Sequence, residues 1–277
     1  MNSFLWLHIF AAYTVYIVVA IATSIVVRKT NGNLKDLNAR NSPRMLLFGG
    51  AANLIAMAGI ICLMVFWDNK SIASLGIALH PSDIVAGFGG LGVTIFMSIG
   101  FLVILHHLKL IESLELVKPV RSVGEIQNTL IGLVVLVTIV LQEEVLNRGY
   151  VTLNVHSFDP IVIILVSITF FVLIHFITNR SNIYQVVSWA ASGFVLIISY
   201  LMSGSIWVPV ALHYGIDATN TFVFNITGRF SFFKISPAMT EAQRAVFRLI
   251  HSCAIVIFLI IIYGLKFRFV SHGLKLP

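Results

Sequence analysis

Residues 129–148 read TLIGLVVLVTIVLQEEVLNR, and this stretch decides how the chain folds. It carries no charged side chain before Glu143 and Glu144, and Arg148 follows four residues after the second glutamate. An apolar run of this kind predicts a helix in the hydrocarbon of a bilayer. Each charge at the centre of such a helix costs about 2.5–3.5 kcal/mol, so charges there usually have a function and partners nearby.

The composition of the chain excludes a soluble globular protein. Of its 277 residues, 58% are hydrophobic and 10% are charged, whereas soluble domains carry about 25% charged residues. The apolar residues fall into blocks near the ~20 residues that a helix needs to cross a bilayer. We therefore expect an all-α, polytopic transmembrane bundle of about eight spans in a single integral domain, 1–277. The expected spans are 4–27, 45–67, 84–105, 126–147, 158–178, 183–202, 206–227 and 246–266.

The charge of the chain indicates the membrane as its partner. The net charge is +7, and most basic residues lie in loops between the spans. Basic loops of a membrane protein usually report its orientation and its contact with anionic lipid. We expect a multi-pass protein of the cell (plasma) membrane that contacts lipid and does not bind nucleic acid. One loop, 108–118, repeats Leu110, Leu114 and Val117 at helical spacing, which predicts a short amphipathic helix on the membrane surface.

Two further sets of polar side chains interrupt apolar segments. His175 ends one span, and His213 and Asp217 lie inside another. Because residues four apart share a face of a helix, Glu144 can form an ion pair with Arg148. For the same reason, Asp217 can approach the ring of His213. If spans four, five and seven are adjacent, two imidazoles and up to three carboxylates converge on one site.

Carboxylates and imidazoles gathered inside a membrane are typical of hydrolysis. Peptide-bond hydrolysis needs an activated water and a group that holds the developing oxyanion. A glutamate can act as the base, and a zinc or similar divalent ion can lower the pKa of its bound water to about 7. The chain has no Gly-x-Ser-x-Gly, His-Glu-x-x-His or phosphate loop, so a serine hydrolase, a zincin or an ATPase is not indicated. Imidazoles commonly bind metals, and the candidate ligands are His175 and His213, with Glu143 or Asp217.

Each of these features also has a purely structural explanation. A glutamate pair before an arginine is often a helix end at the interface, and a lone histidine at the end of a span is often interfacial. Two other functions therefore stay open beside hydrolysis. In a proton-coupled transporter, Glu143, Asp217 and the histidines would form a relay, but no inverted repeat is detectable. In a non-catalytic scaffold, Glu144 and Arg148 would be only a structural pair.

Taken together, the three motifs resemble the CAAX prenyl protease and bacteriocin-processing (CPBP or Abi) family of intramembrane proteases. That family carries Glu-Glu-x-x-x-Arg, Phe-x-x-x-His, and His-x-x-x-Asn or Asp on three separate helices. Here the motifs are EEVLNR at 143–148, FVLIH at 171–175 and HYGID at 213–217, with a family-like GSIW turn at 204–207. The resemblance covers about 125–225, and three motifs in this order are a specific signal.

The resemblance implies an eight-helix intramembrane endopeptidase that cleaves a membrane-associated protein or peptide, in CAAX processing or bacteriocin immunity. Glu143 and His175 would activate water, and His213 and Asp217 would hold the oxyanion or a metal. The family also has members with Asn at the last position, which can donate a hydrogen bond. An ionised Asp217 cannot donate one, so a protonated or metal-bound role is expected there. The implied catalytic residues are Glu143, Glu144, Arg148, His175, His213 and Asp217.

The expected spans leave one geometric conflict. As drawn, they place Glu143 and His213 in one half of the membrane and His175 in the other. At 1.5 Å per residue the offset is about 15 Å or more. A common site therefore requires that span five is displaced or that one span boundary is wrong.

Overall fold

A computed structural model describes residues 5–31, 43–116, 123–178, 181–224 and 232–265. Nearly all of them form helices. The α-helices are α1 (Leu5–Asn31), α3 (Pro43–Cys62), α4 (Pro81–His107), α5 (Val123–Glu144), α6 (Thr152–Val155), α7 (Pro160–Thr178), α8 (Ile183–Ser203), α9 (Trp207–Phe222) and α10 (Glu241–Tyr263). Two π-helices, η1 (Leu63–Trp67) and η3 (Val145–Val151), continue α3 and α5, and a short 3-10 helix, η2, spans Ile72–Leu75.

The all-α membrane bundle that the sequence predicts is confirmed. Within the described ranges, six helices are long and apolar enough to cross a bilayer, and α7 is a shorter apolar helix. Large apolar side chains face outward, such as Phe88 at 74% and Phe96 at 78% exposure on α4. Such side chains suit contact with lipid rather than with water. The chain is an integral, multi-pass membrane protein.

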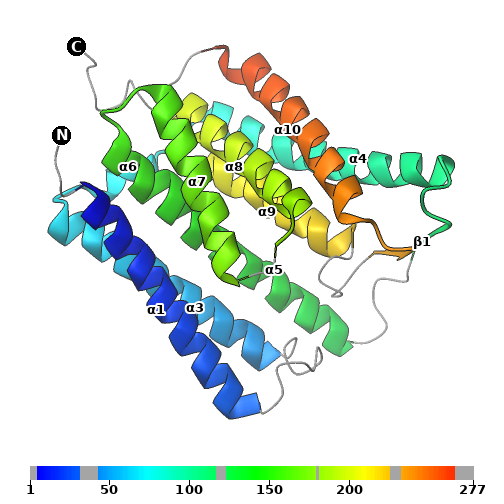
Figure 1. Cartoon of the computed structure of the whole chain (residues 1–277), viewed down its shortest axis with the longest axis horizontal. Coiled ribbons are helices and arrows are strands. Elements are labelled where there is room, and N and C mark those ends of the chain that lie inside the picture. Colours follow the sequence, from blue (N-terminus) through cyan, green and yellow to red (C-terminus); the bar gives the residue numbers. More distant parts are fainter. Residues whose placement is uncertain (1–4, 32–42, 117–122, 179–180, 225–231, 266–277) are drawn as a thin grey trace.

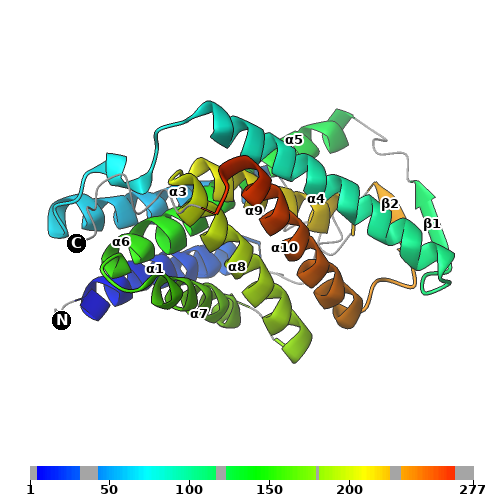
Figure 2. The same cartoon turned by 90° about the horizontal axis from the view of Figure 1, so that it is seen from above.

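The helices form two groups that meet around α9. Figure 1 shows α1, α3 and α5 running side by side along one diagonal, and α3 contacts both of the others. On the other side, α4 crosses α10, and Figure 2 shows α4 lying along one face of the bundle. Helix α9 contacts α4, α5 and α8, while α8 also packs against α7 and α10. Side chains of α9 can therefore meet those of both groups of helices.

Small residues bring α4 and α9 close together. A Cβ added at Gly90 would lie 2.4 Å from Leu212 Cδ2, and one added at Gly215 would lie 2.9 Å from Leu91 Cδ1. Both distances are shorter than real Cβ contacts, so a larger residue would push the helices apart. Packing through small residues is usual in membranes, where no hydrophobic force drives helices together.

The fourth expected span, 126–147, ends too early. The helical path continues through η3 and α6 to Val155. Glu143 therefore lies about 18 Å along the helical path from its end at Val155, at 1.5 Å per residue. Helix α7 starts from the same side at Pro160, and His175 lies about 22 Å along it. The offset in depth expected between Glu143 and His175 came from ending the fourth span at 147. With the helical path extended to Val155, the two residues lie at similar depth.

Two other expectations differ from the structure. The seventh span, expected at 206–227, is the short helix α9, which does not qualify as a span by length and composition; residues 225–231 lie outside the described part. Segment 108–118 is not an amphipathic helix. It forms a turn and the strand β1 (Ser113–Leu116), which pairs antiparallel with β2 (Phe233–Ser236), while 117 and 118 are not described. Backbone pairing with a distant segment overrides the local helical periodicity.

Candidate active site

The two adjacent glutamates lie where α5 changes from an α-helix into a π-helix. Glu144 is the last residue of α5, and η3 begins at Val145. A π-helix has a widened turn and occurs frequently at functional sites. The amide of Asn147 donates to the carbonyl of Glu143 at 2.9 Å, and its Oδ1 accepts from the hydroxyl of Tyr13 on α1. A side chain of a neighbouring helix thus fixes the turn that carries both carboxylates.

Glu144 and Arg148 form the ion pair that their spacing predicts. Arg148 Nη1 lies 3.1 Å from Glu144 Oε1, and both side chains are fully buried. Arg148 Nη2 also donates to the carbonyl of Gly193 on α8 at 3.2 Å. Its guanidinium carbon lies 4.5 Å from the ring centre of Phe171 on α7. The pair therefore links the glutamate helix to α7 and α8.

The imidazole of His213 lies between the two glutamates. Its Nδ1 is 2.7 Å from Glu144 Oε1, and its Nε2 is 3.8 Å from Glu143 Oε2. Nε2 also lies 3.7 Å from Oδ2 of Asp217, one turn along α9. Only the contact with Glu144 is short enough for a direct hydrogen bond. At the other two distances, one water lying to the side of the pair could bond to both atoms.

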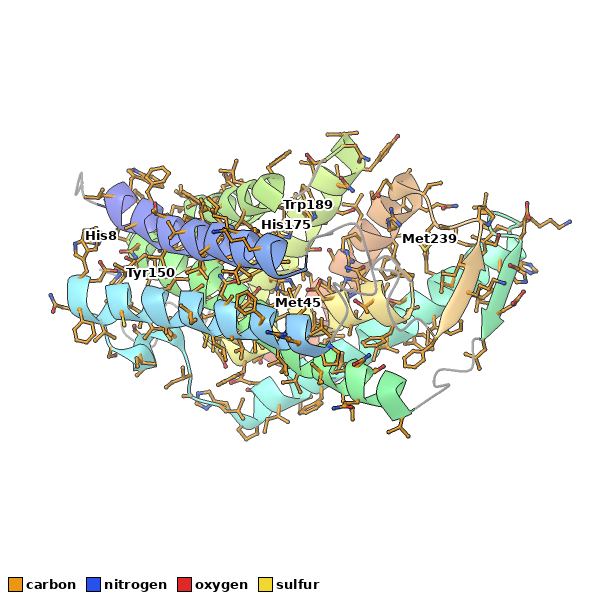
Figure 3. All side chains as sticks on the ribbon, turned by 90° about the horizontal axis from the view of Figure 1, so that it is seen from below. His8, Met45, Tyr150, His175, Trp189 and Met239 are labelled. Carbon is orange, nitrogen blue, oxygen red and sulfur yellow. The ribbon has the colours of Figure 1, made fainter. Side chains whose placement is uncertain are left out.

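His175 joins the site through aromatic contacts. Its Nδ1 lies 2.7 Å from the carbonyl oxygen of Phe171 and donates a hydrogen bond to it. In the neutral ring, Nε2 is then the nitrogen without a proton. The ring of Phe171 lies 4.7 Å from that of His175 and 5.8 Å from that of His213. Trp189 on α8 packs on His175 at 5.0 Å, and Figure 3 shows these two side chains together near the middle of the molecule. The two histidines therefore share one aromatic neighbour.

A cavity of about 230 Å³ opens beside these side chains. His175, His213 and Asp217 line it, together with residues of α8 and α10. Glu143 is not among its lining residues and reaches His213 from the α5 side. On α5, the same face carries Val135 and Ile139, which line a second cavity of about 370 Å³ between α1, α3 and α5. Glu143 thus lies between the 230 Å³ cavity on one side and the face of α5 that borders the 370 Å³ cavity on the other.

The metal site expected at the two histidines stays a prediction. Among the described residues, no group of three His, Cys, Asp or Glu side chains is placed to hold a metal ion. Nδ1 of His213 is bonded to Glu144, and Nδ1 of His175 is bonded to a backbone carbonyl. Bonds of this kind at Nδ1 also orient histidines that bind a metal through Nε2.

The fold brings the acids and imidazoles of the three motifs together inside a membrane-embedded helical bundle. Residues 125–219 match a family model described as type II CAAX prenyl endopeptidase, Rce1-like. The matched segment contains all three motifs, so the resemblance to the CAAX protease family is confirmed over these residues. The match supports a CAAX-type intramembrane protease in general. No curated protein and no solved structure matches the chain.

The sequence-based prediction did not single out Arg248, a charged residue of the cavity. Arg248 on α10 is 6% exposed and lines the cavity, and its Nη2 donates to Asn220 Oδ1 at 3.0 Å. A usable signal was present, because Arg248 is the only charged residue of the expected span 246–266 before Lys266 at its end. The rule that singled out Asp217 applies equally to Arg248.

Proposed function

We propose that the protein is an intramembrane endopeptidase in which Glu143 activates a water molecule beside His213. The observation that carries the proposal is the position of one imidazole between two carboxylates. Glu144 holds Nδ1 of His213 at 2.7 Å, and Glu143 faces Nε2 at 3.8 Å. A base and a second proton-carrying group that can both bond to one water form an arrangement suited to hydrolysis.

The proposed reaction moves one proton through Glu143. A water that bonds to both Glu143 Oε2 and His213 Nε2 gives a proton to the carboxylate while its oxygen bonds to the peptide carbonyl carbon. The tetrahedral oxyanion accepts a hydrogen bond from Nε2–H of His213 when that ring carries both protons. Glu143 then passes the proton to the leaving nitrogen as the C–N bond breaks. The products are a new carboxylic acid and a new amine, and the acid then gives its remaining proton to the amine or to water.

The remaining residues of the site hold these groups in place. Glu144 orients His213, and Arg148 neutralises Glu144. Asp217 and His175 line the same cavity, and we assign them to positioning the water and the peptide carbonyl. The second cavity borders the Glu143 face of α5 and is mostly apolar. That position supports a substrate tethered to the membrane, with the plasma membrane as the proposed location.

The proposal is tested with purified protein in proteoliposomes that carry membrane-tethered fluorogenic peptides. Glu143→Gln is expected to lower kcat/KM by about 10²- to 10⁴-fold and to unfold at the same temperature as the wild type. Glu112→Gln, at an exposed position outside the cavity, is the matched control and should cleave normally. Full activity of Glu143→Gln would eliminate the proposal. Protein-dependent proton flux without any cleavage would instead support a carrier.

A further inference from the structure

Two tyrosines of α1 lie one turn apart, and only one of them has its hydroxyl bonded. The hydroxyl of Tyr13 donates to Asn147 Oδ1 on η3. Tyr16 is partly buried and lines the cavity of about 370 Å³ between α1, α3 and α5. Within the described part of the chain, no hydrogen bond uses the hydroxyl of Tyr16. Because a buried tyrosine hydroxyl usually finds a partner, this free donor indicates an interaction that the fold alone does not satisfy.

Tyr16 and Glu143 lie at similar depth in the bundle. Tyr13 meets Asn147, and later residues of α1 line the cavity with earlier residues of α5, so the two helices are antiparallel. At 1.5 Å per residue, Tyr16 lies about 4.5 Å along α1 from Tyr13, and Glu143 lies about 6 Å along its own helix from Asn147, in the same direction. The two residues are therefore within about 2 Å of the same level.

The carboxylate of Glu143 has one oxygen without a partner. Its Oε2 faces Nε2 of His213 at 3.8 Å, and no hydrogen bond among the described residues uses Oε1. Glu143 lies one turn beyond Ile139, which lines the same cavity as Tyr16. The carboxylate is also within electrostatic range of the Tyr16 hydroxyl. A free donor and a free acceptor therefore lie near each other at the end of one cavity.

One water can join these two groups. Tyr16 and Glu143 make no direct hydrogen bond, and the cavity beside them, at about 370 Å³, exceeds the ~30 Å³ that one water occupies in the liquid. A bridging water is nearly as good as a direct hydrogen bond. Since a carboxylate within a membrane segment is costly, a donor on this side also lowers the cost of burying Glu143.

We propose that Tyr16 is a positioning residue that donates a hydrogen bond, through one water, to Oε1 of Glu143. This bond would keep Oε2 turned toward His213 and the attacking water. The inference rests on the proposed protease function. Helix α1 lies outside the matched segment 125–219, so the family model assigns no role to Tyr16.

The first test does not depend on cleavage. In the full-length protein in detergent, 3-fluorotyrosine replaces Tyr16, and its fluorine NMR signal reports on the surroundings of the phenol. Glu143→Gln should shift this signal. Glu115→Gln, in an exposed ion pair, should leave it unchanged. The same label at Tyr184, which is 49% exposed on α8, should give a signal that neither substitution moves.

The second test separates positioning from folding. Tyr16→Phe should lower kcat by about 10- to 100-fold, as expected for the loss of a hydrogen bond to a charged group. KM should stay close to the wild-type value, because the phenol contacts Glu143 through water and not the substrate. Tyr184→Phe is the matched control and should cleave as the wild type does. If Tyr16→Phe does not fold, the fluorine signal of the labelled protein decides the proposal.

A fluorine signal at position 16 that Glu143→Gln does not move would overturn the proposal, as would a wild-type kcat in Tyr16→Phe. Failure of the protease function gives a different pattern. If Glu143→Gln cleaves normally, the protease proposal is wrong even where the fluorine signal shifts. If Glu143→Gln is inactive and the signal does not move, only the contact with Tyr16 is wrong.

Discussion

Glu144 Oε1 lies 2.7 Å from Nδ1 of His213 while also pairing with Arg148 at 3.1 Å. One carboxylate oxygen therefore orients the imidazole and neutralises a buried guanidinium. Holding Nδ1 of a histidine in this way fixes which ring nitrogen faces the reacting groups. Here that nitrogen is Nε2, which faces Glu143 and Asp217.

Replacing Glu144 tests this double role. Glu144→Gln keeps an oxygen that accepts from His213 but leaves Arg148 buried without a counter-charge. Because removing one partner of a buried ion pair leaves the other uncompensated, we expect a loss of about 3–5 kcal/mol in the free energy of unfolding. Denaturant unfolding in detergent measures it.

The control is a glutamate whose ion pair is exposed. Glu115 pairs with Lys234 at 3.9 Å, with side chains 62% and 68% exposed. Glu115→Gln should change the free energy of unfolding by less than about 1 kcal/mol. A Glu144→Gln protein as stable as this control would show that the buried pair does not stabilise the fold.

Tyr13 provides a second test, of the π-helix that begins directly after the two glutamates. Tyr13→Phe removes the donor to Asn147 Oδ1, and a buried acceptor without a partner costs about 1–3 kcal/mol. We expect lower stability and slower cleavage, because Asn147 also holds the carbonyl of Glu143 at 2.9 Å.

The matched change one residue along α1 is Thr14→Val. The hydroxyl of Thr14 bonds only to the carbonyl of Phe10 in its own helix, at an exposed position. This variant should fold and cleave as the wild type does. Equal behaviour of Tyr13→Phe and Thr14→Val would argue against a positioning role for Tyr13.

Local spacing was enough to predict some of the site, and long-range contacts decided the rest. The Glu144–Arg148 pair follows from residues four apart on one helix. The helical path from α5 to Val155 could not be predicted from the apolar run, because its polar residues are satisfied inside the protein. Asn147 is bonded by Tyr13, which lies far away in the sequence.

The helices that meet at the site show the same limit. Helix α9 is shorter than the span expected at 206–227, and it contacts α4, α5 and α8. The contact of His175 and His213 through Phe171 depends on the tilt and depth of two helices. No pattern within one segment encodes that relation. The three motifs predicted the partners, and only the fold showed which atoms meet.

Removing divalent metals tests the zinc expected from the sequence. The proposed reaction uses protein groups alone, and among the described residues no group of three His, Cys, Asp or Glu side chains is placed to hold a metal ion. We therefore expect cleavage to survive prolonged treatment with a chelator, with metal content measured by mass spectrometry. Loss of cleavage that added zinc restores would establish a metal-dependent enzyme instead.

The most direct test of the central claim is a double-mutant cycle on kcat/KM with Glu143→Gln, His213→Gln and the two combined. If both side chains act on the same water, each single change should remove most of the activity, and the double mutant should be no slower than the slower single mutant. Losses that multiply in the double mutant would show that the two residues act independently. That result would contradict the shared site.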